Sequence, residues 1–480
     1  MEKLYDKLLR MIPGLLLAGI FLAGCDHGSM QGMIICTQVK PAQLKIDLKT
    51  GGNWRYFGQS RIVAIDPAKP GSIARILTKD FFAARSPEIS FDGKRMLFSG
   101  QRNKGDRWQI YEQTLGKNDA RPVIVNDQDC TDPAYLPDGN IIFSSRNISG
   151  DSKEETTLYT CGLNGCCLNR IAYHPNSDFA SSILDDGRIT VISWQVFPDP
   201  TAPVYMTMRP DGTKSELYYK GGRNAWFTGR LRESAGGEIF FVESTIPNPE
   251  KGRLITIKRS RPLNSRQDLS SDIPGDFYSV YPQETGKLLV SYRESGTDRF
   301  GIYEFDTGTK KISDALLNDS EFSSIEPVKV ASRPVPRNLP TEVNKDKTTG
   351  FLMCMDAGFS TMPVMQTQAG DQKTAFVQIL GLNGLIRELP VEEDGSFFVD
   401  ISANTPLRFV TLNDKKEVLR GPSAWMWMRP NERRGCVGCH ENRELAPDNH
   451  VALAIKKLPV EVVVTGTRHE EEGTRGLEHN

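Results

Sequence analysis

Residues 87–98 read PEISFDGKRMLF and residues 133–143 read PAYLPDGNIIF, so the second stretch repeats the first almost position for position. Each places strand-forming residues on both sides of an Asp-Gly pair, the dipeptide that favours a type I′ turn between antiparallel strands. Weaker copies occupy residues 182–191, 235–241 and 284–290. The Asp-Gly pairs could instead supply calcium ligands, but turn formation accounts for them without a metal. The pattern therefore predicts a series of β-hairpins.

These five hairpins recur at a nearly constant distance along the chain. Their turn glycines are separated by 46, 48, 50 and 49 residues and stand at positions 93, 139, 187, 237 and 286. Repeats of ~40–50 residues suit the four-stranded blades of a β-propeller and are longer than a solenoid coil usually needs. Between the hairpins lie strands in which apolar and polar residues alternate, at 109–112, 157–160, 204–207 and 301–304. We therefore expect an all-β protein whose propeller has five to seven blades, with six as the preferred number.

The two ends of the repeat region should close the ring, and a second domain follows. Residues 323–328 form a last partial unit and residues 61–65 an early β-type run, so we expect these two to pair. The proline-rich residues 332–340 cannot join a ladder and should form an extended linker. Beyond the linker, the antiparallel strands of a small β-sandwich are expected at residues 375–380, 395–401 and 407–412.

The charge balance excludes several kinds of partner. The chain has 59 lysines and arginines against 60 aspartates and glutamates, which gives a net charge of −1. Such a balance provides no field to attract nucleic acid and no basic patch for anionic lipid. We therefore expect no nucleic-acid partner, and membrane association would come from a covalent lipid alone.

The N-terminus is typical of an exported bacterial lipoprotein. Three basic residues precede an apolar stretch at residues 12–23, and Leu22-Ala23-Gly24-Cys25 resembles a lipobox. The alternative is an ordinary membrane-spanning anchor, but only 12 residues separate Met11 from Gly24, and a span needs ~20. We expect Cys25 to become the lipidated first residue. The protein would then lie on the periplasmic face of the inner or outer membrane, or at the cell surface.

Residues 433–440 read RRGCVGCH, and the Cys-x-x-Cys-His run is the pattern of covalent c-type haem attachment. Two thiols, Cys436 and Cys439, would add to the vinyl groups of one porphyrin while the imidazole of His440 reaches its iron. The pattern predicts one covalent haem c with His440 as the proximal ligand. The alternative is a structural zinc site or a disulfide, but no second Cys-x-x-Cys or His-x-x-x-His in the sequence completes a four-ligand zinc site.

A second axial ligand would decide between electron transfer and chemistry on a small molecule. His450 lies ten residues beyond the motif and could fold back onto the iron. His174 precedes a blade strand and could reach the iron from the propeller. Met426 lies in an alternating Trp-Met-Trp-Met run. The structural alternatives are a surface loop for His450, a turn for His174 and a packed apolar strand for Met426, and an open distal site is a further option.

The remaining cysteines suit an oxidising compartment. Apart from Cys25 and the motif, the sequence has six: Cys36, Cys130, Cys161, Cys166, Cys167 and Cys354. Residues 160–167 read as a hairpin with a four-residue loop, in which Cys161 and Cys166 would face each other at bridging distance. We expect a disulfide between these two, with isolated buried thiols as the alternative.

These residues resemble a known family. The repeat region resembles the PD40 or TolB-like propeller, while residues 391–399, 425–430 and 435–447 resemble hydrazine synthase alpha-subunit-type proteins. In that family the alpha subunit joins a propeller to c-haem domains, with the catalytic haem near their junction. The resemblance implies that the haem-bearing segment docks against the propeller, with the propeller mouth over one haem face.

The sequence also departs from that family. In the hydrazine-forming enzyme a tyrosine four residues beyond the motif histidine ligates the iron, and the histidine turns to a zinc. Here that position is Glu444, and no second Cys-x-x-Cys-His follows His440. The resemblance therefore does not imply hydrazine synthesis. His440 is expected as an ordinary proximal ligand, with Glu444 or a zinc-bound His440 as alternatives.

The chain is expected to comprise a signal peptide (1–24), a tether (25–55), the propeller (56–331), a linker (332–345), a small β domain (346–430), a haem segment (431–460) and a tail (461–480). We expect a lipid-anchored monohaem protein that exchanges electrons with a redox partner protein, or that acts on a small nitrogen or oxygen species at an open iron. The alternative is a binding or scaffold lipoprotein whose propeller recognises a glycan or a protein.

Overall fold

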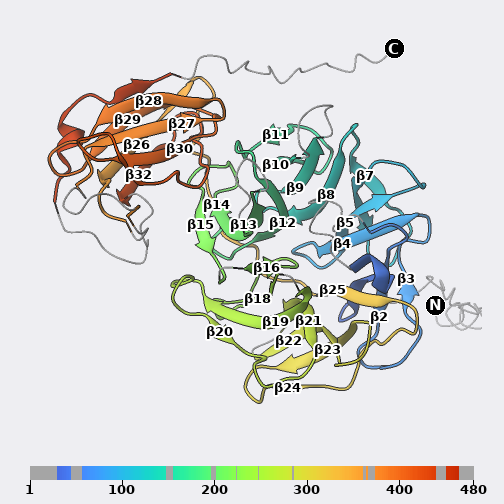
Figure 1. The fold of residues 1–480 in the computed structure, drawn as a ribbon. Coiled ribbons are helices and arrows are strands. Elements are labelled where there is room, and N and C mark those ends of the chain that lie inside the picture. The colour runs from blue at the N-terminus through green and yellow to red at the C-terminus, as the bar shows by residue number, and fades with distance from the viewer. Residues whose placement is uncertain are drawn as a thin grey trace, which may run out of the picture.

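A computed structural model describes residues 30–44, 57–147, 155–195, 202–222, 224–246, 248–283, 286–360, 364–365, 373–438 and 450–463. Two β domains lie side by side (Figure 1). Across the described residues the helical elements are the short 3-10 turns η1 (Pro41–Leu44) and η3 (Leu453–Lys456), which confirms the expected all-β class. None of the helices in these residues is long and apolar enough to span a membrane.

The first domain is a β-propeller, in which the described strands form six blades around a central channel (Figure 1). Each innermost strand pairs with its neighbour in antiparallel fashion, and the last two blades share one sheet because β19 touches β21. The closing blade contains β25 (Ser323–Lys329), β1 (Ile34–Val39), β2 (Arg61–Ile65) and β3 (Arg75–Ile76). The second contains β4 (Ala83–Ile89), β5 (Arg95–Gln101), β6 (Gln109–Thr114) and β7 (Arg121–Ile124). The third contains β8 (Asp129–Tyr135), β9 (Asn140–Asn147), β10 (Glu155–Gly162) and β11 (Asn169–Arg170).

The remaining blades continue around the ring. The fourth contains β12 (Ser177–Ile183), β13 (Ile189–Trp194), β14 (Val204–Met208) and β15 (Glu216–Tyr219). The fifth contains β16 (Ala225–Phe227), β17 (Arg232–Glu233), β18 (Glu238–Thr245), β19 (Asn248–Lys258) and β20 (Gln267–Asp268). The sixth contains β21 (Asp276–Pro282), β22 (Lys287–Arg293), β23 (Gly301–Asp306) and β24 (Lys311–Ile312).

The ring closes differently from the expected pairing. β25 pairs with β1, and β1 in turn pairs with β2, so residues 323–328 do not pair directly with residues 61–65. The predicted tether therefore supplies a propeller strand, and the propeller begins before residue 34 rather than at residue 56. β1 has the sequence IICTQV, every residue of which is buried. No Asp-Gly turn adjoins β1, which is why the repeat pattern did not reveal it.

The innermost strands of four blades share a β-bulge that lines the channel. Ser86, Asp132, Ala180 and Glu326 have φ of 55°, 55°, 58° and 55°, a region that residues with a side chain rarely adopt. The Ser86 hydroxyl donates to Asp132 Oδ1 at 3.0 Å, and the Ala180 amide donates to Asp132 Oδ2 at 3.1 Å. The Ser86 amide donates to Glu326 Oε2 at 2.9 Å. Hydrogen bonds between neighbouring blades thus offset the backbone strain of the bulges.

The linker runs across one face of the propeller without forming a helix or strand. The amide of Arg333 donates to the Phe91 carbonyl, and the amide of Arg337 donates to the Asp185 carbonyl, each at 2.9 Å. The hairpin turn at Gly187 has φ of +89°, and a side chain there would collide with the Arg337 carbonyl. The turns therefore need glycine for their backbone conformation and, in this blade, for the passage of the linker.

The second domain is a β-sandwich of two four-stranded sheets. One sheet has the order β32-β26-β29-β33 and the other the order β28-β27-β30-β31. The strands are β26 (Thr349–Asp356), β27 (Phe376–Gly381), β28 (Gly384–Pro390), β29 (Phe397–Ser402), β30 (Arg408–Leu412), β31 (Val418–Arg420), β32 (Arg433–Gly438) and β33 (Val460–Val462). The three expected strands correspond to β27, β29 and β30. β32 pairs with β26 in parallel, so the first residues of the expected haem segment belong to the sandwich.

Candidate functional site

β32 fixes the position of the first motif cysteine. It is the edge strand of its sheet, and Cys436 is the register partner of Cys354 on β26. Cys354 is buried, whereas Cys436 is half-buried, and both pack against the sandwich core. The motif residues Cys439 and His440, together with Glu444, lie outside the described residues, as does Cys25. The structure therefore describes the motif as far as Gly438, the last residue of β32.

His450 lies at the same end of the sandwich as Gly438, the last residue of β32. Gly438 is the register partner of Asp356, and Asp356 packs so closely on Gly395 that a side chain there would collide with it. The neighbouring Asp394 accepts a hydrogen bond from the Leu453 amide at 2.7 Å, and its Oδ2 lies 3.8 Å from His450 Nε2. These contacts hold residues 450–453 against the turn beside the end of β32.

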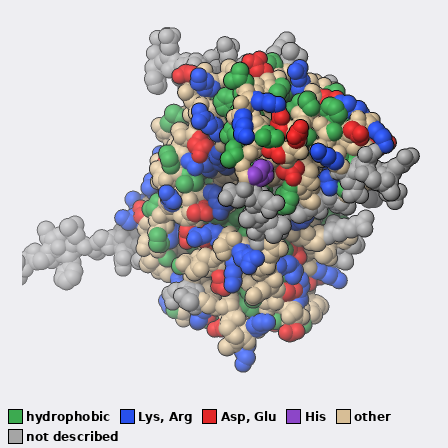
Figure 2. Space-filling model, turned by 90° about the vertical axis from the view of Figure 1, so that its left-hand side faces the viewer, with side chains coloured by type: hydrophobic (Ala, Val, Ile, Leu, Met, Phe, Trp, Pro, Cys, Tyr) green, Lys and Arg blue, Asp and Glu red, His purple; other side chains and the backbone are tan. Residues whose placement is uncertain are grey.

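In the same turn, the pKa of Asp394 is lowered. Burial alone would raise the pKa of Asp394, but hydrogen bonds from the Ser396 hydroxyl and from the Leu453 and Ser396 amides, together with the charge of His450, lower it. Figure 2 shows this side of the molecule, where acidic and basic side chains are interspersed and a histidine is exposed. Of the two described histidines, His174 is buried and His450 is exposed. Asp394 is thus an anionic partner for His450 at the surface.

His174 has a different environment from the one its candidacy required. Its Nδ1 accepts a hydrogen bond from the Asn176 amide at 3.1 Å, and its Nε2 lies 2.9 Å from Asp178 Oδ2. The ring packs on Trp427, with the centroids 4.8 Å apart. Because both ring nitrogens face protein atoms, His174 does not offer a ligand to an iron in this structure. The alternative expectation, a turn residue, describes it better.

Met426 and Trp427 face opposite domains. Met426 is half-buried and packs on the sandwich core as expected, but the expected strand is absent from residues 425–428, where Met426 makes only an isolated bridge with Leu407. Trp427 is fully buried among propeller side chains of the third and fourth blades, including Leu136 and Val191. The two side chains therefore belong to two different hydrophobic cores.

The residues just before the motif bind the sandwich to the propeller. Glu432 is fully buried, accepts hydrogen bonds from the Lys214 and Arg429 amides at 2.8 Å, and pairs with Arg434 at 2.7 Å. Lys214 follows β14, and in Figure 1 the sandwich lies next to β14 and β15. The start of the predicted haem segment therefore docks on the fourth blade. Sequence reasoning missed Glu432, because a carboxylate among basic residues looks like an exposed loop.

The expected Cys161–Cys166 disulfide is wrong. Cys161 is buried in the blade core, whereas Cys166 is exposed, and neither takes part in a disulfide. The Cys166 carbonyl accepts a hydrogen bond from the Gly162 amide at 2.9 Å, so Cys166 lies opposite Gly162 rather than Cys161. Successive residues of a strand point to opposite faces, and this shift by one residue separates the two thiols.

A buried charge cluster, which sequence reasoning did not find, lies at the channel. Glu88 accepts hydrogen bonds from Arg230 at 3.0 Å, from Arg232 at 2.9 Å and from Arg333 at 2.7 Å. Burial alone would raise the pKa of Glu88, but the charges of these arginines outweigh it and lower the pKa to about 2. Nothing in the local sequence signals the cluster, because the four residues come from three distant segments.

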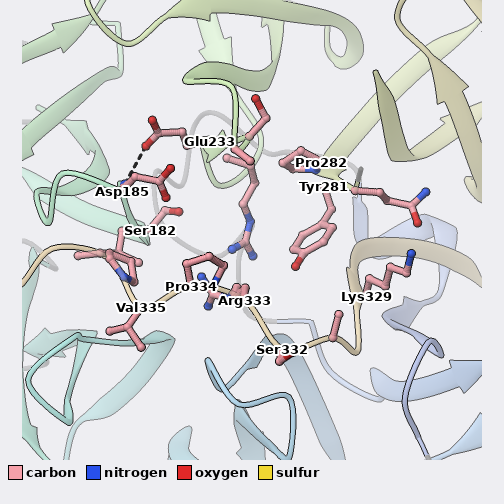
Figure 3. Close-up of a pocket in the computed structure, with 17 residues that line it drawn as sticks. Ser182, Asp185, Glu233, Tyr281, Pro282, Lys329, Ser332, Arg333, Pro334 and Val335 are labelled. Atoms are coloured by element: carbon pink, nitrogen blue, oxygen red, sulfur yellow. Dashed lines mark hydrogen bonds between the residues drawn. The ribbon is translucent and has the colours of Figure 1, made fainter. Parts of the chain in front are cut away.

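A cavity of about 630 Å³ opens beside this cluster (Figure 3). Its walls are the ends of β12, β21 and β25, the β17 turn and the linker at residues 331–336. No described residue of the sandwich lines it. The resemblance had implied that the haem covers the propeller mouth. In the described part of the chain, the linker borders the mouth and the sandwich lies beside the fourth blade.

The fold and the site define a two-domain protein, a six-bladed β-propeller that carries a β-sandwich with a Cys-x-x-Cys-His run at its edge. Residues 354–441 match the family model of the hydrazine synthase alpha subunit middle domain. Hydrazine synthase subunit alpha of Kuenenia stuttgartiensis is 22% identical over an alignment 493 residues long. The alignment covers 76% of this chain and 61% of that protein. The expected resemblance to hydrazine synthase alpha-subunit-like proteins is therefore confirmed.

One solved structure shows the same fold. Kuenenia stuttgartiensis hydrazine synthase aligns with a TM-score of 0.74 and 22% identity, over 89% of this chain and 72% of that chain. TolB from Acinetobacter baumannii aligns with a TM-score of 0.45 and 15% identity, over 62% of this chain and 67% of that chain. The chain spans about 61% of the length of the hydrazine synthase subunit that it matches.

Proposed function

We propose that this chain is a lipid-anchored monohaem c-type protein that transfers electrons or carries out redox chemistry on a small molecule. The observation that carries the proposal is the position of the Cys-x-x-Cys-His run, which starts on an edge strand inside the region that matches the hydrazine synthase family model. Among the described residues, β32 pairs with β26 on one side and with no strand on the other.

The donor set fits a covalent haem. Cys436 and Cys439 would form the two thioethers, and the His440 imidazole would reach the iron. When bound, the haem supplies a one-electron couple whose potential depends on the axial ligands and on burial. Cys436 is held by the ladder of β32 with β26, so the first attachment point is fixed by backbone hydrogen bonds.

His450 is the preferred candidate for a second axial ligand. The contacts around Asp394 hold His450 at the end of the sandwich where β32 ends. His174 is engaged by Asn176, Asp178 and Trp427, and Met426 packs against the sandwich core. If His450 binds the iron, the haem is low-spin and suited to electron transfer; if it does not, the iron has an open position for a small ligand.

Hydrazine synthesis itself is not proposed. Glu444 stands where the family enzyme has its iron-binding tyrosine. Lipidation at Cys25, export and a redox partner protein complete the proposal, and all three rest on the sequence alone.

The test is expression with cytochrome c maturation factors, followed by a pyridine haemochrome spectrum of the denatured protein. We expect a c-type spectrum that is lost in Cys436→Ser. The matched control is Cys166→Ser, which removes an exposed cysteine outside the motif and should keep the haem. A colourless wild-type protein, or equal haem in Cys436→Ser, would contradict the proposal. The spin state of wild type and of His450→Ala then separates a carrier from an open iron.

A second candidate function is favoured by the cavity at the propeller mouth. In this alternative the chain is a binding or scaffold lipoprotein, and the motif holds zinc or is structural. Purification of a colourless protein that contains one zinc per chain, lost in Cys436→Ser, would support this alternative over the haem.

A further inference from the structure

The cavity at the propeller mouth has a polar, positively charged wall. Arg232 extends from β17, and Arg333 and Ser332 come from the linker. Lys329 lies at the end of β25. Figure 3 shows Tyr281 with its hydroxyl directed toward the linker at Arg333 and Ser332. A cavity of about 630 Å³ falls in the range of small-molecule sites, ~300–1,000 Å³.

The opposite wall is acidic but largely satisfied. Glu233 accepts a hydrogen bond from the Asp185 amide at 2.8 Å and pairs with Arg259 at 2.6 Å. Asp185 itself is an exposed turn residue. In Figure 3 these two carboxylates lie on the side away from Tyr281 and Lys329. The cavity therefore has a basic and an acidic side rather than a uniform charge.

The charge cluster behind the basic wall contains more cations than anions. Glu88 is a single carboxylate that receives hydrogen bonds from three guanidinium groups. The adjacent Arg85 pairs with Glu326 at 2.8 Å and lies 3.5 Å from Asp132. Four arginines and three carboxylates thus meet behind this wall. Burial, partly offset by the charge of Glu88, lowers the pKa of Arg230 to about 10, and repulsion from Arg232 adds to this.

The two arginines on the cavity wall keep donors for a ligand. Arg232 uses Nη1 for Glu88, and Arg333 uses Nη2 for Glu88 and for the Ile89 carbonyl. A guanidinium group has five N–H donors, so each retains several. Burial raises the pKa of Tyr281, so its hydroxyl stays protonated at neutral pH and can donate as well. These donors converge on the cavity from β17, β21 and the linker.

We propose that the cavity binds a small organic acid, whose carboxylate accepts hydrogen bonds from Arg232 and Arg333 and from the Tyr281 hydroxyl. The planar guanidinium fork matches the geometry of a carboxylate. The ligand contacts the linker through Arg333. This proposal is independent of the haem, since no described sandwich residue lines the cavity.

The test uses the full mature chain in low-salt buffer with isothermal titration calorimetry. The probes are succinate, its neutral analogue succinamide, and inorganic phosphate. Succinate should bind, succinamide should not, and Arg333→Gln should weaken succinate binding on the order of tenfold or more, the effect of one charge-assisted hydrogen bond. Arg107→Gln is the matched control, because Arg107 is a half-exposed arginine near Asp129 in another part of the propeller, and it should bind like wild type.

Tyr281→Phe keeps the test meaningful if Arg333→Gln misfolds. Among the described residues the structure records no hydrogen bond from the Tyr281 hydroxyl, so the substitution should leave folding intact and weaken succinate binding several-fold. The proposal is overturned if succinate does not bind, if succinamide binds equally, if phosphate alone binds, or if Tyr281→Phe and Arg333→Gln bind as wild type does. Haem content, read from absorbance, should be the same in every variant, so failure here leaves the haem proposal untouched.

Discussion

Replacing Glu88 by glutamine should destabilise the propeller by removing the one carboxylate that three arginines share. Glutamine has nearly the same shape, so the core packing is kept. Its single carbonyl oxygen cannot serve the donors that now contact both oxygens of Glu88, and its amide group would face a guanidinium. The substitution therefore isolates the charge of Glu88 from its volume.

The size of the effect follows from the pKa of Glu88. The pKa falls from 4.5 to about 2 in the folded protein, since the arginine charges outweigh the burial that would raise it. Each tenfold change in acid strength corresponds to ~1.4 kcal/mol, so ionised Glu88 contributes about 3 kcal/mol to the free energy of unfolding at neutral pH. The loss of one partner from a buried ion pair typically costs a similar ~3–5 kcal/mol.

The pH dependence has a definite sign. A carboxylate whose pKa is lower in the folded state stabilises the fold fully above its unfolded pKa of 4.5, and loses that contribution as the pH falls toward 2. The difference in unfolding free energy between wild type and Glu88→Gln should therefore be constant from pH 6 to 7 and shrink below pH 4.5. Urea denaturation at several pH values, followed by tryptophan fluorescence, measures this difference.

A matched control compares the loss of the buried carboxylate of Glu88 with the loss of an exposed carboxylate. Glu321 pairs with Lys40 at 2.8 Å, but its side chain is 68% exposed. Exposed pairs contribute little, so Glu321→Gln should change stability only slightly. Equal losses in the two variants, or a loss in Glu88→Gln that does not vary between pH 7 and pH 3, would refute the reasoning.

Two further predictions concern the domain interface and the cysteines. Trp427→Ala should lower the free energy of unfolding by about 3–5 kcal/mol and expose the linker to protease, because the fully buried Trp427 side chain packs on His174 across the interface. Trp427→Phe should retain most of the protection against cleavage. Unchanged cleavage of Trp427→Ala would contradict this role. Iodoacetamide should modify Cys166 in the native protein but not Cys161. Cys166 is exposed, whereas burial raises the pKa of Cys161 to about 12. Peptide mapping by mass spectrometry reads out both sites, and native labelling of Cys161 would show that its blade opens.

The propeller was predictable because its signals are local. The turns depend on a few neighbouring residues, and the glycines at the five repeat positions all have positive φ. The expected type I′ geometry is wrong, because Asp92, Asp138 and Asp186 do not have positive φ and the amides of Gly93, Gly139 and Gly187 close the turns as their fourth residues. The ring closure was not predictable in the same way. β1 pairs with β25 nearly 290 residues away, and no turn joins the two, so only long-range packing selects the partner.

The candidate site divides along the same line. The spacing of Cys436, Cys439 and His440 indicates haem attachment because the chemistry itself requires adjacent residues. The Cys161–Cys166 expectation failed for the opposite reason: a loop register that differs by one residue moves a side chain to the other face, and spacing alone does not determine that register.

By itself, the sequence determined the repeat, the order of the two domains and the position of the Cys-x-x-Cys-His run, because each depends on residues that are neighbours in the chain. Only the tertiary structure decided which charges meet. Glu88 contacts Arg232 across 144 residues and Arg333 across 245. Closure of the ring brings these residues together, and an ion pair depends on distance in space rather than along the chain.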